Sequence, residues 1–444
     1  MNYYFVGIGG IGMSAIARFF HQRGDRVCGY DRTPSPLTRA LEAEGIQVHY
    51  DDDPARIPSQ VDLAVYTPAV PRDTAVMQWL LSHGIPLKKR SQVLGELTRD
   101  KKCIAVAGTH GKTTTSSMIA YILHQSHVGC SAFLGGISNN FKSNMVVNTD
   151  SDWVVVEADE FDRSFLQLHP YYSVITATDP DHLDIYGTYE NMLAAFTQYA
   201  SQTEKEGMLL LKSGLSCAPL NGLLTRTYSS HPSQGDYFCS NIQNHNGDLS
   251  FDLTTPSGIL KDLWLTNSCL YNVENAVAAS AVALQCGVSE DELRVALRTF
   301  SGIYRRFDYR VKNSHIIFID DYAHHPEEIR ATLSSVRYMF PGKRVMGIFQ
   351  PHLYSRTRDF ADGFAEILSE LDIVALLDIY PARELPIPGI SSRMLLDRIT
   401  NPDKRLLLRD QVIPAILQSR PDILLTIGAG DIDRIVPEIE KALL

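Results

Sequence analysis

The sequence predicts three consecutive α/β domains, and three observations lead to that prediction. The 444 residues exceed one typical core, since domains run to about 150 residues each. Short apolar runs alternate with stretches of helical period, which is the pattern of βαβ units on a parallel sheet. Glycine-rich turns follow two of these runs, at 7–12 and 108–111. We expect the domains at 1–92, 93–301 and 302–444.

The first and last domains are expected to be Rossmann-like. Parallel strands are predicted at 3–8, 26–31, 46–50 and 62–67 in the first domain, and at 315–321, 344–350, 372–380 and 422–430 in the last. The Gly- and Arg-rich stretch at 300–310 precedes the last series and predicts a hinge.

The central domain is expected to carry a P-loop ATPase fold with a parallel sheet and a small antiparallel part. Its parallel strands are predicted at 103–108, 152–159, 172–178 and 207–212. From about 225 to 270 the apolar residues lose their helical spacing and instead alternate with polar residues. The Asn-Gly pair at 246–247 is typical of a hairpin turn. This segment is therefore predicted to be an antiparallel insertion or sheet edge. A helix over 272–287 follows it.

Composition excludes several classes of function. The net charge of -10 argues against nucleic acid or an anionic membrane as the main partner, because clustered Lys and Arg bind such surfaces. No apolar run reaches the ~20 residues of a membrane span, and the N-terminus lacks the basic region of a signal peptide. The seven cysteines are scattered, without zinc-site or disulfide spacing. We expect a cytoplasmic protein without membrane insertion, either a monomer or a weak homodimer.

The turn at 7–12 has the pattern G-x-G-x-x-G through Gly7, Gly9 and Gly12. It lies between a predicted strand and a predicted helix, where backbone N–H groups bind a diphosphate. Asp31 ends the next strand, at the spacing of a residue that binds a ribose hydroxyl. Close packing of helix on strand would also explain the glycines. The context favours a nucleotide site that also includes Gly10, without indicating which nucleotide.

A second turn predicts a phosphate-binding loop. It comprises Gly108, Thr109, His110, Gly111, Lys112, Thr113 and Thr114. The usual loop has a further glycine where this chain has Val106. The physical requirements remain: two glycines let the backbone curl, Lys112 adds a charge for phosphate oxygens, and the Thr113 hydroxyl can bind Mg²⁺. A plain strand-to-helix turn would not need a lysine and threonines at a helix start.

Acidic residues follow two further predicted strands of the central domain. One group contains Glu157, Asp159, Glu160 and Asp162, and the other contains Asp179, Asp181, His182 and Asp184. Ligands gather at the carboxyl ends of parallel strands, so both groups should face the phosphate loop. Carboxylates there suit Mg²⁺, although most of these acids would serve equally as helix caps. We retain Glu157 and His182 as metal ligands.

Several motifs together resemble the Mur ligases of peptidoglycan synthesis. They are GTHGKTTTSSM, EADEFDRSFLQLHP, DPDHLDIYG, YNVENAVAA, FSGIYRRFD, DDYAHHPEEI, FQPHLYSRT and IGAGDI. They cover nearly the whole chain in the family's order. The resemblance implies a UDP-sugar domain, a central ATPase and a C-terminal ligase domain. It also implies that ATP phosphorylates a carboxylate and that an amine then attacks the acyl phosphate.

The resemblance also implies roles for individual residues. Lys112, Glu157, His182 and Arg356 would be catalytic, and Thr113, Glu157 and His182 would bind Mg²⁺. ATP would contact the loop from Gly108 to Thr114 and also Asn272, Asn275, Arg305, Asp321 and His324. Gly7, Gly9, Gly10, Gly12 and Asp31 would bind the UDP-sugar, and Tyr322 would lie near the amino acid. Leu353 stands where some relatives have arginine.

The N-terminal GIGGIGMSA is most similar to members that join L-alanine to UDP-N-acetylmuramate. Addition of another amino acid or of a peptide stays open, because selectivity depends on pocket shape. Two other classes explain parts of the chain. A nicotinamide-dependent dehydrogenase would use the first turn and Asp31, and a regulatory P-loop ATPase or kinase would use only the second turn.

Overall fold

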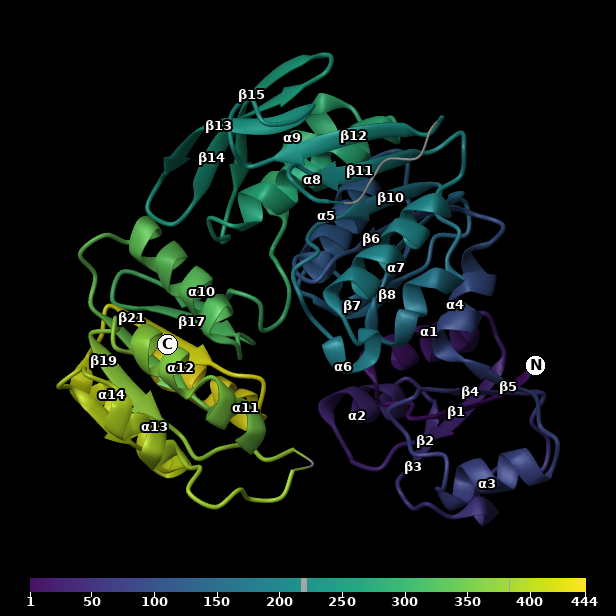
Figure 1. The fold of residues 1–444 in the computed structure, drawn as a ribbon, viewed down its shortest axis with the longest axis horizontal. Helices are drawn as coiled ribbons and strands as arrows, with labels where there is room; N and C mark the ends of the chain where they lie inside the picture. The colour runs from purple at the N-terminus through teal and green to yellow at the C-terminus, as the bar shows by residue number, and fades with distance from the viewer. Residues whose placement is uncertain (217–221, 383) are drawn as a thin grey trace. The chain divides into compact units, whose positions relative to one another are not determined.

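A computed structural model describes residues 1–216, 222–382 and 384–444 of the chain. In these residues the strands form three sheets of five, ten and six strands (Figure 1). Each sheet lies in one of the three predicted α/β regions, so the predicted fold class is confirmed. Within the described part of the chain, no helix is both long and apolar enough to cross a membrane.

The first sheet has the strand order β3-β2-β1-β4-β5, and its pairs are parallel. The strands are β1 (Asn2–Val6), β2 (Arg26–Tyr30), β3 (Gln47–His49), β4 (Leu63–Tyr66) and β5 (Leu87–Lys89). The helices are α1 (Ile11–Gln22), α2 (Pro36–Ala43), α3 (Ala75–Ser82) and α4 (Arg90–Thr98). Tyr3 and Phe5 join one core cluster and Tyr4 and Val6 another, because successive strand residues point to opposite faces.

The second sheet has the order β15-β14-β13-β12-β11-β10-β6-β9-β7-β8. Its strands are β6 (Lys102–Ala107), β7 (Ser131–Ser138), β8 (Ser143–Val146), β9 (Trp153–Glu157), β10 (Tyr172–Ile175), β11 (Met208–Lys212), β12 (Leu224–Ser229), β13 (Tyr237–Asn244), β14 (Leu249–Thr255) and β15 (Gly258–Leu265). The helices are α5 (Lys112–Gln125), α6 (Leu183–Tyr186), α7 (Tyr189–Ser201), α8 (Asn272–Gln285) and α9 (Glu290–Thr299). Helix α1 contacts β7 and β8 of this sheet (Figure 1).

The edges of the second sheet differ in part from the prediction. The sequence predicts an antiparallel insertion or a sheet edge at 225–270, and strands β12 to β15 do form one edge of the sheet. However, β12 pairs in parallel with both β11 and β13. The segment thus first extends the parallel sheet, and short turns then connect β13, β14 and β15. At the other edge β7 and β8 pair antiparallel. The sequence did not predict this pair, because consecutive glycines at 135–136 interrupt the apolar pattern of β7.

The third sheet has the order β16-β17-β21-β18-β19-β20. Its strands are β16 (Asp308–Lys312), β17 (Ile317–Asp321), β18 (Val345–Phe349), β19 (Ile373–Leu376), β20 (Lys404–Leu406) and β21 (Ile423–Ile427). Only β16, paired with β17, is antiparallel among the described strands of this sheet. The helices are α10 (Pro326–Met339), α11 (Tyr354–Asp359), α12 (Ala361–Leu368), α13 (Ser392–Arg398), α14 (Val412–Ser419) and α15 (Val436–Leu443).

The chain divides into two compact units. The first comprises Met1–Asn241, Phe251–Leu263 and Glu274–Phe300, and the second comprises Ile242–Ser250, Trp264–Val273 and Ser301–Leu444. The first sheet and most of the second belong to the first unit, and the third sheet belongs to the second unit. The predicted boundary at 92/93 lies inside α4, so the domain boundaries remain a prediction.

Candidate active site

The glycine-rich turn joins β1 to α1 at the carboxyl end of the first sheet. Gly7 adopts a φ of +85°, a left-handed conformation that glycine tolerates. The Gly9 amide donates to Asp31 Oδ2 at 2.8 Å, and the Thr33 amide donates to Asp31 Oδ1 at 3.3 Å. Asp31 therefore holds the turn in place. Its predicted contact with a ribose stays a prediction.

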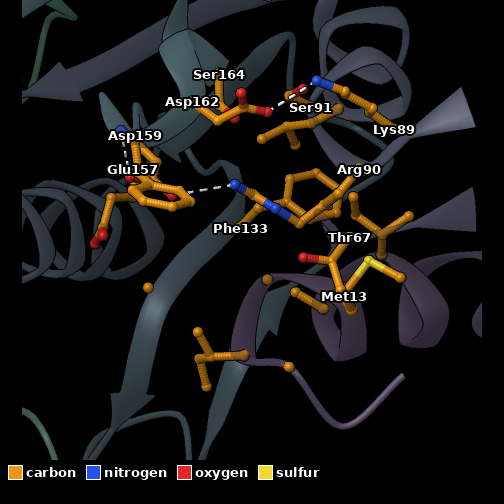
Figure 2. Close-up of a pocket in the computed structure, with 18 of the residues that line it drawn as sticks. Met13, Thr67, Lys89, Arg90, Ser91, Phe133, Glu157, Asp159, Asp162 and Ser164 are labelled. Carbon is orange, nitrogen blue, oxygen red and sulfur yellow. Dashed lines mark hydrogen bonds and ion pairs between the residues drawn. The ribbon is translucent and has the colours of Figure 1, made fainter. Parts of the chain in front are cut away.

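This turn forms part of a pocket within the first unit (Figure 2). Gly10 and Gly12 line the pocket together with Lys89, Arg90 and the acidic end of β9. A Cβ at Gly12 would lie 2.9 Å from Arg90 Nη1, so glycine is needed for the guanidinium to approach α1. Two cations near a helix N-terminus favour an anionic ligand. Of the residues predicted to bind the nucleotide, Gly10 and Gly12 line the pocket, whereas Gly7, Gly9 and Asp31 are not among its lining residues. Binding of a nucleotide diphosphate here stays a prediction.

Both cations of this pocket pair with carboxylates of the loop after β9. Lys89 Nζ lies 2.8 Å from Asp162 Oδ2, and Arg90 Nη2 lies 3.3 Å from Asp159 Oδ2 (Figure 2). All four side chains line the same pocket. An anionic ligand there would meet cations that are already partly neutralised.

The predicted phosphate loop connects β6 to α5, as expected. Gly108 and Gly111 have φ values of +132° and +81°, and these values explain why the turn needs glycine at both positions. Thr113 and Thr114 are buried in the first turn of α5. The Asp179 amide donates to Thr109 Oγ1 at 3.1 Å, which joins the loop to the end of β10. The first amides of α5 lack helical partners and are available to phosphate.

Lys112 contacts an acid that the sequence prediction did not retain. Its Nζ donates to the Gly108 carbonyl at 2.6 Å and to Glu160 Oε1 at 2.8 Å. The Glu160 side chain is only 1% exposed. Burial raises the pKa of Glu160, and the charge of Lys112 opposes that shift. The pair places a carboxylate next to the cation predicted to bind the γ-phosphate.

Glu157 lies at the end of β9. It lines the pocket that contains Gly10, Gly12, Lys89 and Arg90, here called the anion pocket. A Cβ at Gly135 of β7 would lie 2.1 Å from Glu157 Oε2. Glycine at 135 is therefore required for the carboxylate to occupy this position. Glu157 Oε2 is buried and accepts no hydrogen bond within the described residues. An orphaned carboxylate oxygen of this kind suits a cation.

His182 lies beside Glu160 and Asp181. Its Nε2 is 3.9 Å from Glu160 Oε1 and 3.6 Å from Asp181 Oδ2. One ligand atom from each of the three residues lies within 4.8 Å of the others. Like Glu157, Glu160 keeps a buried oxygen without a hydrogen-bond partner among the described residues. Carboxylate oxygens with one imidazole fit Mg²⁺. The predicted set named Glu157 and His182 and omitted Glu160.

The two predicted adenine-binding asparagines begin α8. Asn275 Oδ1 accepts a hydrogen bond from Thr115 Oγ1 of α5 at 3.1 Å. The same oxygen lies 3.0 Å from the position of a Cβ at Gly111. Asn275 is thus adjacent to the phosphate loop. Asn272 is buried, and its predicted contact with adenine stays a prediction.

Arg305, predicted to contact ATP, has several partners within the second unit. Its guanidinium donates to Asp320 Oδ2 at 3.2 Å and to the carbonyls of Gly428 and Gly430. The side chain is 9% exposed. These hydrogen bonds hold the guanidinium against β17 and the loop after β21, and its predicted contact with ATP stays a prediction. The next residue, Arg306, is exposed.

The remaining predicted residues of the second unit follow β17 and β18. Asp321 accepts hydrogen bonds from the Ala323 amide and from Thr332, both at 2.9 Å. Burial raises the pKa of Asp321 to about 6. The Tyr322 and His324 rings are 5.4 Å apart. Asp321 therefore braces the loop that carries both rings.

Arg356 lies in α11, and its Nη1 donates to His352 Nδ1 at 3.2 Å. His352 stacks on Tyr380 and lies 6.4 Å from His324, centroid to centroid. The pKa of His352 is lowered to about 4, mainly by burial of the imidazole and further by its proximity to Arg356 and His324. A neutral, partly buried imidazole thus lies beside an arginine. The imidazole suits an apolar group of a ligand, and the arginine suits a carboxylate.

Three segments of the chain match domains of one known protein family. Residues 2–102 match the Mur ligase family, catalytic domain; residues 106–283 match the Mur ligase middle domain; and residues 305–430 match the Mur ligase, glutamate ligase domain. The chain belongs to the Mur ligase family.

Curated relatives of this Mur ligase extend over its full length. A UDP-N-acetylmuramate--L-alanine ligase of Porphyromonas gingivalis is 52% identical, with 99% of this chain and 98% of the relative aligned. A protein of the same name from Flavobacterium johnsoniae is 47% identical over 100% of this chain and 98% of the relative. The crystal structure of UDP-N-acetylmuramate-alanine ligase from Thermotoga maritima superposes with a TM-score of 0.86 at 27% identity, covering 100% and 99% of the chains.

These matches confirm the resemblance that was stated from the motifs. Mur ligases are ATP-dependent enzymes, and this one is therefore an ATP-dependent ligase. Three successive Mur ligase matches leave no support for the dehydrogenase or for a regulatory ATPase.

Two residues of this Mur ligase were missed by sequence reasoning. Glu160 was one of several acids after β9, and no sequence signal separates it from Asp159 or Asp162. His352 stands in the FQPHLYSRT motif, and that motif was the available signal. Helical spacing does not predict its contact with Arg356, because α11 begins at Tyr354 and Leu353 before it has a φ of +69°.

Proposed function

We propose that this Mur ligase joins L-alanine to the lactoyl carboxylate of UDP-N-acetylmuramate and converts ATP to ADP and phosphate. One observation carries the proposal: the loop after β9 connects the two sites. Its Asp159 and Asp162 line the anion pocket, and its Glu160 contacts Lys112 of the phosphate loop. A carboxylate bound in the pocket would therefore lie near a γ-phosphate. The named relatives support the choice of substrates.

The chemistry follows from the poor reactivity of a carboxylate. A carboxylate oxygen attacks the γ-phosphorus, and the bond from that phosphorus to the β-phosphate oxygen breaks, releasing ADP. The ammonium group of alanine loses one proton to become a nucleophilic amine, which attacks the acyl carbon. Phosphate then leaves, and the nitrogen loses a second proton as the amide forms. Lys112 stabilises the charge on the transferred group.

Mg²⁺ fits the acidic ends of the strands. His182 would hold it together with Glu160 and Asp181, because one ligand atom from each of these residues lies within 4.8 Å of the others. Thr113 and Glu157, the other two predicted ligands, are not part of this cluster and stay a prediction. When bound there, Mg²⁺ supplies charge neutralisation for the phosphoryl group. If His182 binds the metal through its imidazole, it does not accept the proton of the amine, because the lone pair of its ligating nitrogen is then used by Mg²⁺.

The second unit supports selection of a small amino acid. Arg356 offers a charge for the α-carboxylate, and the rings of Tyr322, His324 and His352 give a partly apolar surface close by. A pocket that accepts a methyl group gains roughly 1–3 kcal/mol over glycine, or about 10- to 200-fold.

The test is ADP release with UDP-N-acetylmuramate and single amino acids. We expect release to require both substrates, with L-alanine favoured over glycine by about 10- to 200-fold in kcat/KM. L-serine and D-alanine complete the panel. Release that continues without the UDP-sugar would contradict the ligase activity, and preference for another amino acid would contradict only the choice of L-alanine.

A further inference from the structure

The loop from Asp159 to Arg163, here called the acidic loop, is held from two sides. Asp159 and Asp162 pair with Arg90 and Lys89 at the edge of the first sheet. Glu160, which lies between them in sequence, pairs with Lys112 at 2.8 Å. One short loop therefore neutralises the cations of both proposed nucleotide sites.

Each of these ion pairs occupies a cation that a ligand would need. Lys89 and Arg90 line the anion pocket, and Lys112 begins the helix after the phosphate loop. A phosphate group that binds either site competes with a carboxylate for the same donors. Like charges repel at short distance, so ligand and carboxylate cannot both keep full contact with one cation.

The acidic loop is also strained. Asp162 and Arg163 adopt φ values of 52° and 54°, although neither is glycine. Such conformations persist only where surrounding contacts impose them. On the inner side, Tyr186 donates to the Glu160 carbonyl at 2.6 Å, and the Arg163 guanidinium lies 5.5 Å from the Tyr186 ring. Loss of the ion pairs on one side would favour a relaxed loop, and Glu160 would move with it.

We propose that the acidic loop is an interlock between the two nucleotide sites. A UDP-sugar in the pocket withdraws Lys89 and Arg90 from the loop, the loop relaxes, and Glu160 releases Lys112 for the phosphate of ATP. Thermodynamic reciprocity requires that ATP favours the UDP-sugar by the same factor. Glu160 is thus a positioning residue that acts through Lys112. The inference rests on the proposed function only for the identity of the two ligands.

Calorimetry on the full chain tests the interlock. The dissociation constant of UDP-N-acetylmuramate is measured with and without saturating AMP-PNP and Mg²⁺, in the absence of L-alanine. For the wild type we expect AMP-PNP to tighten binding by about 5- to 150-fold, the usual range of coupling. The coupling ratio is the dissociation constant without AMP-PNP divided by that with AMP-PNP. In the double variant Asp159→Asn/Asp162→Asn this ratio should fall towards one.

Two further variants sharpen the test. Measured without Mg²⁺ and without the UDP-sugar, Glu160→Gln should bind AMP-PNP more tightly than the wild type, because the phosphates no longer compete with a charged carboxylate for Lys112. Glu96→Gln is the matched control: Glu96 pairs with Lys88 at 2.7 Å, next to Lys89, but lies outside the acidic loop. This control should keep the wild-type coupling ratio.

Several results would overturn the interlock. They are a wild-type ratio of dissociation constants equal to one, retention of the wild-type ratio in the double variant, loss of coupling in Glu96→Gln, and unchanged or weaker binding of AMP-PNP by Glu160→Gln in the absence of Mg²⁺. A wild type that binds neither ligand would instead contradict the proposed function.

Discussion

The Lys112 ammonium donates hydrogen bonds to the Gly108 carbonyl and to Glu160. Its side chain is 15% exposed. The ammonium is therefore held inside the loop that would surround the phosphates. Its charge acts where negative charge develops during phosphoryl transfer, and such a contact is worth roughly 10²- to 10³-fold in rate.

Replacement of Lys112 tests this role. Lys112→Ala should lower kcat by at least about 10²-fold, because the transferred group loses its cation. Binding of UDP-N-acetylmuramate should be no weaker than in the wild type, because Lys112 does not line the anion pocket. Steady-state kinetics and calorimetry give the two values, with Lys88→Ala as the control for loss of a lysine. A folded Lys112→Ala protein that fails to bind the UDP-sugar would contradict the separation of the sites.

Residue roles were predictable from sequence only where a local pattern determines them. Lys112 begins a helix directly after Gly108 and Gly111, so its place follows from the turn itself. The loop that pairs Glu160 with Lys112 has left-handed backbone at Asp162 and Arg163. Neither residue is a glycine, so the sequence does not predict this conformation. Similarly, Arg305 lies among Asp320 and two distant carbonyls, and only the folded chain brings these together.

At the scale of elements, strands were predictable because they are buried. The run at 344–350 became β18 (Val345–Phe349), all of whose residues are buried. Predicted strands extend too far at their carboxyl ends, as at 172–178, where β10 ends at Ile175. The residues predicted beyond the end of β10, 176–178, are buried in the loop that follows it. Buried loop residues and buried strand residues have similar composition, so the sequence does not show where the strand ends. The antiparallel strand β16 was missed because its residues are mostly polar.

The loop between β18 and α11 provides a prediction about pH. Arg356 Nη1 donates to His352 Nδ1, so this nitrogen must be unprotonated. The pKa of His352 is lowered to about 4 in the folded chain, against about 6.5 in an unfolded one. Between these values the unfolded state binds more protons, and the stability of the fold must therefore decrease as pH falls below about 6.5.

The comparison variant is His352→Gln, which keeps an acceptor for Arg356 but does not titrate. From pH 7 to pH 5 the wild type should lose on the order of 1 kcal/mol more stability than the variant, an amount already reduced because the imidazole is only partly buried. Thermal unfolding of both proteins at the two pH values measures the difference. Equal losses would mean that His352 titrates normally in the folded chain.

At the scale of the whole molecule, the sites are distributed over two compact units. The anion pocket, the phosphate loop and the acidic loop belong to the first unit, whereas Tyr322, His324 and Arg356 belong to the second. The first unit therefore contains the groups proposed for phosphoryl transfer to the carboxylate. The second unit contains those proposed to hold the amino acid.

The route of the carboxylate oxygen tests the proposed reaction most directly. UDP-N-acetylmuramate labelled with ¹⁸O in both oxygens of the lactoyl carboxylate is turned over with ATP and L-alanine, and the released phosphate is analysed by mass spectrometry. If the carboxylate attacks the γ-phosphorus and phosphate then leaves the acyl carbon, each phosphate must carry one ¹⁸O and the amide product must keep the other. Phosphate without ¹⁸O would contradict the acyl-phosphate route.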